Sequence, residues 1–272
     1  MRPYATPFFI LIKDQKITHY TQRISKIMRI LIIRHGDPDY VNDSLTPRGD
    51  REAELLAGII DRFGIDEVFL SPQGRAQRTA SRSLSRLGLS GTTLQWLHEF
   101  VPLIRRPDRD PVKTIAWDWR PSDWTVHPEF FDKDRWFTNE IMTAGGVEKE
   151  FVKVTEGLDE LLSAHGYRRD GLVYRVEESN HKTLAFFCHF GVECVILGHL
   201  LNISPMQLWH GFVASPTSVT SLYTEERVPG TASFRVNFFG ATPHLFGAGV
   251  EVSRRARFVE CAGDPGDGFE RP

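Results

Sequence analysis

The strongest pattern along the chain is a pair of short apolar runs without polar interruption. Residues 29–33 (RILII) and 183–188 (TLAFFC) lack the alternation of a half-exposed strand, so both are predicted to be buried central strands. Turn signals and shorter runs of apolar or strand-forming residues predict four further strands, at 68–70, 93–97, 218–225 and 233–239.

Helices are predicted between these strands from capping residues and apolar spacing. Thr46 and Pro47 suit the N-cap and first turn of a helix that ends near Gly64. Further helices are predicted from the Ser71-Pro72 pair to about residue 87, from about 147 to 164, and from 191 to 201. Strands that alternate with helices predict an α/β fold, a three-layer sandwich with a mostly parallel central sheet and helices on both faces.

The regular pattern runs from Met28 to about residue 252, which predicts a single catalytic domain over 28–252. Residues 101–145 interrupt it with prolines, dense charge and four tryptophans, so we interpret this stretch as an insertion with structure of its own. Residues 1–27 form an N-terminal extension whose status stays open, because Met28 begins an apolar strand as a natural start would. Residues 253–272 turn basic and then rich in Gly, Pro and Asp, and are expected to fray.

Composition narrows the class of protein. The net charge of −2 arises from 33 basic and 35 acidic side chains, and this balance argues against a nucleic-acid partner. Three cysteines without metal-type spacing indicate a reducing, cytoplasmic setting with no disulfide framework. The early apolar run, residues 8–12, is too short for a signal peptide or a membrane span, so no membrane partner is expected.

The candidate chemistry lies where the predicted parallel strands end. Arg34, His35 and Gly36 follow the first strand, Arg75 lies shortly after the second, and His189 directly follows residues 183–188. Ligands of open α/β sheets bind beyond the carboxyl ends of the strands. Arginine matches phosphate oxygens two at a time, and a neutral imidazole can act as a nucleophile when its other nitrogen is held. This combination indicates phosphoryl transfer.

Four segments resemble the histidine phosphatase superfamily, in the branch that contains phosphoglycerate mutases and many small phosphatases. They are RHG at 34–36, LTPRG at 45–49, SPQGRAQRTA at 71–80 and FCHFGVE at 187–193, and with TPHL at 242–245 the resemblance extends from residue 29 to about 245. The RHG triplet alone is a weak signal, but its combination with the other segments in this order is specific.

The resemblance implies a role for each matched residue. His35 corresponds to the nucleophile that becomes phosphohistidine, and Arg34, Arg75 and His189 correspond to ligands of the phosphate group. Glu99, after the third predicted strand, corresponds to the acid that protonates the leaving group and then activates water. Burial would raise the pKa of Glu99 as that role requires. The implied activity is metal-independent hydrolysis of phosphate monoesters, with no cofactor.

The sequence departs from the family pattern at two places. Asp37, Pro38 and Asp39 follow RHG where Glu or Gln and Ser or Thr are usual, so two carboxylates are expected near the mouth of the pocket. Asp37 is therefore a candidate substrate-binding residue, and the proton donor stays open between Glu99 and the two aspartates. Phe190 replaces the usual Gly after the second histidine and is expected to narrow the pocket wall.

Other phosphatase chemistries fit the residues less well. The cysteine phosphatases need Arg six positions after Cys, and none of the three cysteines has it. The haloacid dehalogenase type needs Asp-x-Asp directly after a strand, whereas Arg34, His35 and Gly36 intervene here. None of the ten histidines pairs with a second ligand on one helix face, so no metal site is expected.

Two alternatives remain open from the sequence. A mutase would need further cations for a second phosphate, and Arg105, Arg106 and Arg109 are candidates, although a solvated charge run explains them as well. A non-catalytic phosphate-binding protein would lack His35 or the acid, and His35 is present. The expected partner is a small phosphorylated substrate or a phosphopeptide, selected by the insertion at 101–145.

Overall fold

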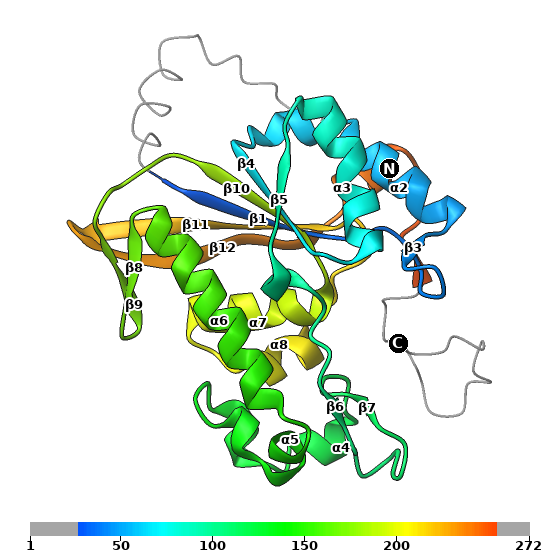
Figure 1. Cartoon of the computed structure of the whole chain (residues 1–272), viewed down its shortest axis with the longest axis vertical. Helices are drawn as coiled ribbons and strands as arrows, with labels where there is room; N and C mark the ends of the chain where they lie inside the picture. The colour runs from blue at the N-terminus through cyan, green and yellow to red at the C-terminus, as the bar shows by residue number, and fades with distance from the viewer. Residues whose placement is uncertain (1–26, 255–272) are drawn as a thin grey trace, which may run out of the picture.

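The computed structural model describes residues 27–254, and its centre is an eight-stranded mixed sheet (Figure 1). In sheet order the strands are β5 (Gly91–Thr93), β4 (Glu67–Leu70), β10 (Thr183–Cys188), β1 (Arg29–Arg34), β11 (Val219–Val228), β12 (Thr231–Ala241), β9 (Val173–Val176) and β8 (Tyr167–Asp170). The first four are parallel to one another, and every pairing from β1 onward to β8 is antiparallel. The extension before residue 27 and the tail after residue 254 lie outside the described residues.

Helices cover both faces of this sheet (Figure 1). One face carries α2 (Pro47–Ala57) and α3 (Gly74–Leu87), and the other carries α6 (Val147–Ala164), α7 (Phe190–Leu201) and α8 (Pro205–Gly211). The predicted α/β three-layer sandwich is thus confirmed, with its parallel part formed by β5, β4, β10 and β1. Outside residues 101–145, the short elements are β2 (Pro38–Asp39), β3 (Ser44–Leu45), the 3-10 turns η1 (Ile60–Phe63) and η2 (Gln95–Leu97), and α9 (Pro243–Gly247).

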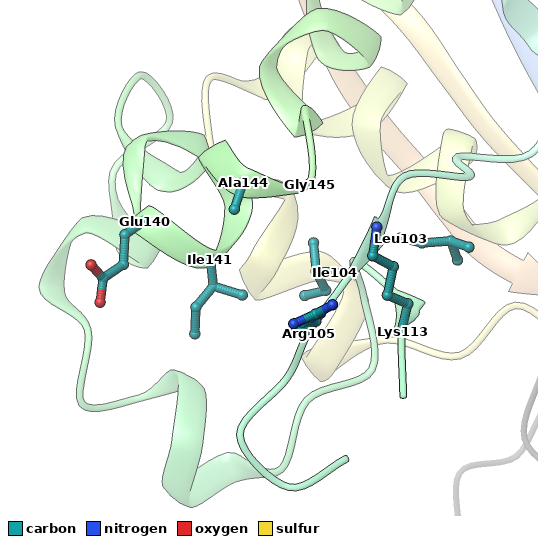
Figure 2. A pocket seen from close by; sticks show the side chains of 8 residues that line it. All are labelled: Leu103, Ile104, Arg105, Lys113, Glu140, Ile141, Ala144 and Gly145. Atoms are coloured by element: carbon teal, nitrogen blue, oxygen red, sulfur yellow. The ribbon is translucent and has the colours of Figure 1, made fainter. Parts of the chain in front are cut away.

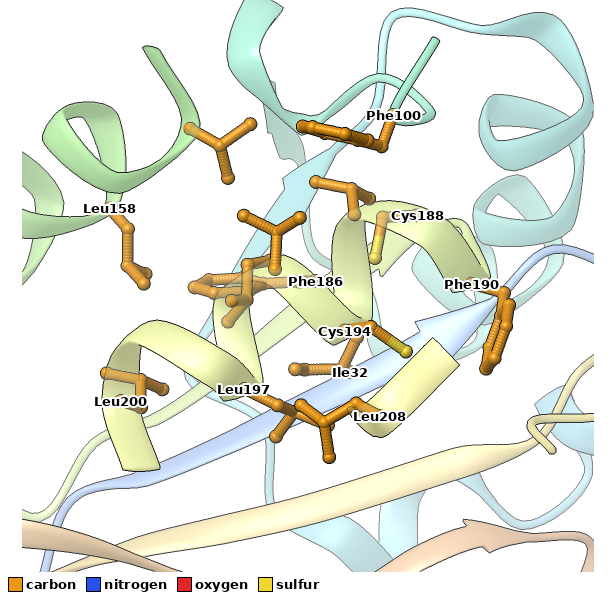
Figure 3. Close-up of a cluster of buried hydrophobic side chains, with 14 of the residues drawn as sticks. Ile32, Phe100, Leu158, Phe186, Cys188, Phe190, Cys194, Leu197, Leu200 and Leu208 are labelled. Atoms are coloured by element: carbon orange, nitrogen blue, oxygen red, sulfur yellow. The ribbon is translucent and has the colours of Figure 1, made fainter. Parts of the chain in front are cut away.

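The uninterrupted apolar runs are explained by burial on both faces. In β1, Ile30 and Ile32 belong to the larger hydrophobic cluster, on the side of α6 and α7, whereas Leu31 and Ile33 belong to the smaller one under α2 and α3. Successive side chains of a strand point to opposite faces, so a central strand needs apolar residues at every position. Figure 3 shows part of the larger cluster, where Ile32 lies near Phe186 and Cys194.

Local capping follows the sequence at the start of α2. The Thr46 hydroxyl accepts a hydrogen bond from the Gly49 amide (3.1 Å), and Pro47 occupies the first helical position. The helix itself ends at Ala57, a separate 3-10 turn, η1, extends from Ile60 to Phe63, and Gly64 follows in the left-handed conformation.

The predicted strand at 93–97 is wrong in its extent. Strand β5 covers Gly91–Thr93, and residues 95–97 form η2 instead. Leu97 is fully buried and Trp96 packs against the larger cluster, so the chain turns inward to bury both side chains. The β8–β9 hairpin and helices α8 and α9 were not predicted, because their sequences are short and carry no apolar period.

Residues 101–145 form a hairpin of β6 (Leu103–Ile104) and β7 (Thr114–Ile115), followed by α4 (Pro121–Trp124), the turns η3 (Pro128–Phe131) and η4 (Trp136–Thr138), and α5 (Glu140–Ala144). Trp117, Trp119 and Trp136 are buried in the larger cluster, and the Trp136 ring contacts Trp209 of α8 at 5.3 Å between centroids. These tryptophans therefore join the segment to the main core. Among residues 27–254, the helices include none with the length and apolarity that a membrane span requires.

Candidate active site

The carboxyl ends of the four parallel strands bring the predicted residues to one edge of the sheet. Arg34 is the last residue of β1 and His35 follows it, while Arg75 is the second residue of α3, which follows β4. His189 follows β10 as the N-cap of α7, and Glu99 follows η2, after β5. The rings of His35 and His189 lie 5.0 Å apart between centroids. The arrangement is the one expected for a ligand site of an open α/β sheet.

His35 is held by both its backbone and its ring. Its amide donates to the Cys188 carbonyl (3.0 Å), and its carbonyl accepts from the Thr217 amide (3.1 Å). The ring Nδ1 lies 2.7 Å from the Gly36 carbonyl oxygen, which can only accept. Nδ1 therefore carries the proton, and the lone pair is on Nε2.

Burial lowers the pKa of His35 well below its ordinary value, and the positive charges of Arg34 and Arg75 lower it further. The side chain is 1% exposed. The imidazole is therefore neutral near pH 7 and has a nucleophilic nitrogen available.

Two glycines allow the loop after His35 to pack directly on the start of α2. A Cβ added to Gly36 would lie 2.7 Å from the Gly49 carbonyl oxygen, and one added to Gly49 would lie 2.3 Å from the Asp37 carbonyl oxygen. Both distances are shorter than any real contact, so a side chain at either position would push α2 away from the loop. The Gly36 amide also donates to the Thr79 hydroxyl of α3 (2.9 Å), which fixes the loop from its other side.

The two arginines are each held through one nitrogen. Arg34 donates from Nη1 to the Ala214 carbonyl (2.5 Å), and Arg75 donates from Nη1 to the Asp43 carboxylate (2.7 Å). The Nε atoms of both are buried and have no hydrogen-bond partner among residues 27–254. Phe190 is fully buried with its ring 5.8 Å from the Arg34 guanidinium, so this residue forms an apolar wall that keeps water from Arg34.

His189 supplies a third unpaired donor. Its Nε2 lies 2.7 Å from the Ser71 hydroxyl, which accepts from the Gln73 amide and has no other acceptor among residues 27–254 for its own hydrogen. When that hydroxyl donates to Nε2, the ring proton is on Nδ1, and Nδ1 is buried with no partner in the described part of the chain. Buried donors without acceptors are rare, and here they belong to residues whose rings or charges act on His35, as in an anion-binding pocket.

Glu99 has the electrostatic character of a proton donor. Its Oε1 accepts hydrogen bonds from the amides of Phe100 (2.7 Å) and Val192 (3.1 Å), so a proton on this carboxyl resides on Oε2. Burial raises the pKa of Glu99, although the two amides and the charges of Arg75 and Arg34 partly offset this. A carboxyl with a raised pKa is suited to general acid catalysis.

Asp37 and Asp39 each have hydrogen-bond partners close by in the fold. Asp37 is buried. Its carboxylate accepts hydrogen bonds from the hydroxyl of Thr46, the N-cap of α2 (2.7 Å), and from the hydroxyl of Ser253 near the end of the described chain. The Asp39 carboxylate accepts from the Val41 and Asn42 amides within its own loop. These donors hold both side chains in local contacts, and a role for either carboxylate at the pocket mouth stays a prediction.

Asp43 is a site residue that the sequence did not indicate. One carboxylate oxygen pairs with Arg75 and the other accepts from the Gly74 amide (2.6 Å) at the start of α3. Its backbone lies in the left-handed region (φ 43°), and the Tyr40 ring of the same loop lies 5.5 Å from the Arg75 guanidinium. No motif marks Asp43, because its role depends on how the loop 40–43 folds back onto α3.

Glu193 of α7 is a second acid that the sequence did not indicate. It is 1% exposed and accepts a hydrogen bond from the Thr220 hydroxyl (2.5 Å). Burial raises the pKa of Glu193 to about 8, with the hydrogen bond and Arg34 offsetting part of the effect. Glu193 is therefore protonated at neutral pH and does not neutralise Arg34.

This raised pKa predicts a pH-dependent stability. An unfolded glutamate loses its proton near pH 4.5, whereas folded Glu193 keeps it to about pH 8. Its contribution to stability is complete below about pH 4.5. As the pH rises from about 4.5 to about 8, the free energy of unfolding falls by up to about 1.4 kcal/mol per pH unit. Glu193→Gln should flatten this slope in denaturant unfolding measured from pH 5 to 8. Exposed Glu148→Gln is the control, and equal slopes for Glu193→Gln and wild type would contradict the assignment.

Comparisons with known proteins identify a family model and a shared fold. The model of the histidine phosphatase superfamily (branch 1) matches residues 30–103. No curated protein matches the chain at a significant level. Three solved structures are similar in fold. Mycobacterial glucosyl-3-phosphoglycerate phosphatase has 15% sequence identity and a TM-score of 0.51, and the match covers 79% of this chain and 99% of that chain. Entamoeba histolytica phosphoserine phosphatase has 17% identity, a TM-score of 0.50 and coverage of 80% and 99%, and Shigella flexneri alpha-ribazole phosphatase has 19% identity, a TM-score of 0.50 and coverage of 79% and 97%.

The fold is therefore that of the histidine phosphatases, and the matched segment holds Arg34, His35, Arg75 and Glu99. The resemblance inferred from the sequence, to the histidine phosphatase superfamily in its phosphoglycerate mutase-like branch, is confirmed.

Proposed function

We propose that this protein is a phosphatase that hydrolyses phosphate monoesters through a phosphohistidine at His35. The observation that carries the proposal is the neutral, buried His35, whose Nε2 is left with its lone pair among three unpaired donors. These donors, Arg34 Nε, Arg75 Nε and His189 Nδ1, match the need for positive charge and hydrogen bonds around the transferred oxygens.

The reaction has two steps. His35 Nε2 attacks phosphorus, the bond from phosphorus to the leaving oxygen breaks, and the proton on Glu99 Oε2 moves to that oxygen. Water then attacks the phosphohistidine, and the Glu99 carboxylate takes up its proton as the bond between phosphorus and Nε2 breaks. Inorganic phosphate leaves, and both His35 and Glu99 return to their starting states. Arg34, Arg75 and His189 stabilise the charge on the phosphoryl oxygens throughout.

The mutase alternative loses support from the placement of its candidate cations. Arg106 is 3% exposed and forms ion pairs with Asp108 (3.1 Å) and Asp118 (3.7 Å), so it stabilises the insertion. Arg105 lines a separate cavity that includes none of the residues around His35. The similar structures include phosphatases named for phosphoserine and for glucosyl-3-phosphoglycerate. A small phosphorylated metabolite is therefore the substrate class we propose.

The direct test is hydrolysis of p-nitrophenyl phosphate by the purified full-length chain in the presence of excess EDTA. We expect turnover to persist, because the cations of the pocket are arginines, and residues 27–254 hold no cluster of three His, Cys, Asp or Glu able to bind a metal ion. Absence of turnover together with tight binding of inorganic phosphate would instead favour a phosphate-binding protein. Loss of turnover that magnesium restores would favour a metal-dependent reaction.

Asp43 is expected to act as a positioning residue for Arg75. Asp43→Ala removes the acceptor that holds Nη1, so Arg75 should lose its orientation and inhibition by inorganic phosphate should weaken by about 10-fold. Asp43→Asn keeps an acceptor oxygen and should stay within about threefold of wild type. Asp61→Ala, which breaks an exposed ion pair with Arg86 at the other end of α3, is the control. Tighter phosphate binding in both Asp43 variants would mean that Asp43 competes with phosphate for Arg75.

A further inference from the structure

A cavity of about 470 Å³ lies between the β6–β7 hairpin and α5 (Figure 2), and His35 is not among the residues that line it. Its apolar side is formed by Leu103, Ile104, Ile141 and Ala144, with the Ile104 and Ile141 side chains facing the space between the two elements. Ile104 is 1% exposed, so the floor of the cavity is part of the main core. This volume is in the range of ordinary small-molecule sites.

Two cations stand at the hairpin side of this cavity without a counter-charge. Strand β6 pairs with β7 so that Ile104 faces Thr114, where the pairing ends, and Arg105 and Lys113 are the next residues on the two arms of the hairpin. Both line the cavity, and neither has a hydrogen bond or ion pair within residues 27–254. Glu140 also lines the cavity, but it lies on the far side of Ile141 with its carboxylate directed away (Figure 2). Like charges opposite one another across a hairpin are destabilising.

The same protein contains a matched pair in which this repulsion is relieved. In the β8–β9 hairpin, Arg168 faces Arg175, and the Glu177 carboxylate lies 3.6 Å from the first and 3.9 Å from the second. A single carboxylate thus bridges both cations. At Arg105 and Lys113 the equivalent carboxylate is missing from the described chain, and an apolar cavity lies beside the two cations instead.

We propose that this cavity binds a small carboxylate with an apolar body. The carboxylate bridges Arg105 and Lys113 as Glu177 bridges the other pair, and the hydrocarbon part lies against Ile104, Ile141 and Ala144. The ligand offsets the charge repulsion and buries apolar surface in the same step. The site is independent of the chemistry at His35, since the two share no lining residue.

The experiment is titration of the full-length protein with hexanoate, followed by ligand-observed NMR. We expect a dissociation constant of about 1 mM or lower, with acetate and 1-hexanol each binding at least about 10-fold more weakly. Acetate lacks the apolar body and hexanol lacks the charge. Equal binding of either one, or no binding of hexanoate to wild type, would overturn the proposal.

Variants locate the binding. Arg105→Gln with Lys113→Gln should weaken hexanoate at least about 10-fold, while Arg168→Gln with Arg175→Gln removes the same charge from the other hairpin and should leave binding unchanged. Without hexanoate, the Arg105/Lys113 variant should melt no lower than wild type, because a repulsive contact is removed. Saturating inorganic phosphate should not displace hexanoate. Displacement would place the ligand at His35 and overturn the proposal, as would unchanged affinity in the Arg105/Lys113 variant.

Discussion

Replacing His35 with alanine should remove nearly all phosphatase turnover, by at least about 1000-fold, and should abolish the phosphoenzyme. His35 Nε2 is the nitrogen left with a lone pair near the unpaired donors, because Nδ1 is held by the Gly36 carbonyl. Without the imidazole, water would have to attack the substrate directly. The measurements are steady-state kinetics with p-nitrophenyl phosphate and phosphoryl labelling quenched in alkaline denaturant, in which wild type should trap a base-stable, acid-labile phosphohistidine.

Phosphate binding and a control variant distinguish lost chemistry from lost structure in His35→Ala. Arg34, Arg75 and His189 stay in place in the His35→Ala variant, so inorganic phosphate should still raise its melting temperature. His199→Ala removes a histidine of α7 that pairs with Asp159 (2.9 Å) outside the pocket, and this variant should keep wild-type turnover. Substantial activity in His35→Ala, or a phosphoenzyme that survives the substitution, would show that another residue is the nucleophile.

The parts of this fold that could be predicted are those with a local signature. Residues 30–33 and 184–188 are apolar at every position because β1 and β10 are buried on both faces, and Thr46 caps α2 through its own hydroxyl. The half-exposed hairpin β8–β9 carries charged residues on its open face, so its sequence does not differ from that of a loop. Residues 95–97 turn inward because Trp96 and Leu97 reach the core, which depends on tertiary contacts.

The residues of the candidate site also differ in whether the local sequence indicates their position. Arg34, His35 and His189 follow directly from strand ends, where the chain order determines the side-chain position. The Asp37 carboxylate is bound by the hydroxyls of Thr46 and Ser253, and Ser253 lies more than 200 residues away in the sequence. Asp43 reaches Arg75 only through the fold of its loop. A charged side chain's direction depends on partners that the local sequence does not contain.

Glu99 is the residue whose role depends most on its surroundings, and its replacement should discriminate between substrates. Glu99→Gln should lower turnover of an alkyl phosphate by about 100-fold or more, the usual scale of general acid catalysis. An alkoxide leaves only with a proton, whereas nitrophenolate leaves readily without one, so p-nitrophenyl phosphate should be affected far less. Glutamine keeps an oxygen to accept from the Phe100 and Val192 amides, and the variant should therefore stay folded.

The pH profile provides the second readout for Glu99. Burial raises the pKa of this carboxyl, so in wild type the alkyl-phosphate rate should fall as pH rises through that raised pKa and the proton is lost. In Glu99→Gln this decline should disappear. Asp37→Asn and Asp39→Asn are the matched carboxylate controls and should change the ratio of alkyl to aryl rates little. Asp37 is bound by the Thr46 hydroxyl at the start of α2, and Asp39 is bound by the Val41 amide within its own loop. A large selective loss of alkyl turnover in Asp37→Asn, with none in Glu99→Gln, would move the proton donor to Asp37 and leave the phosphohistidine at His35 unaffected.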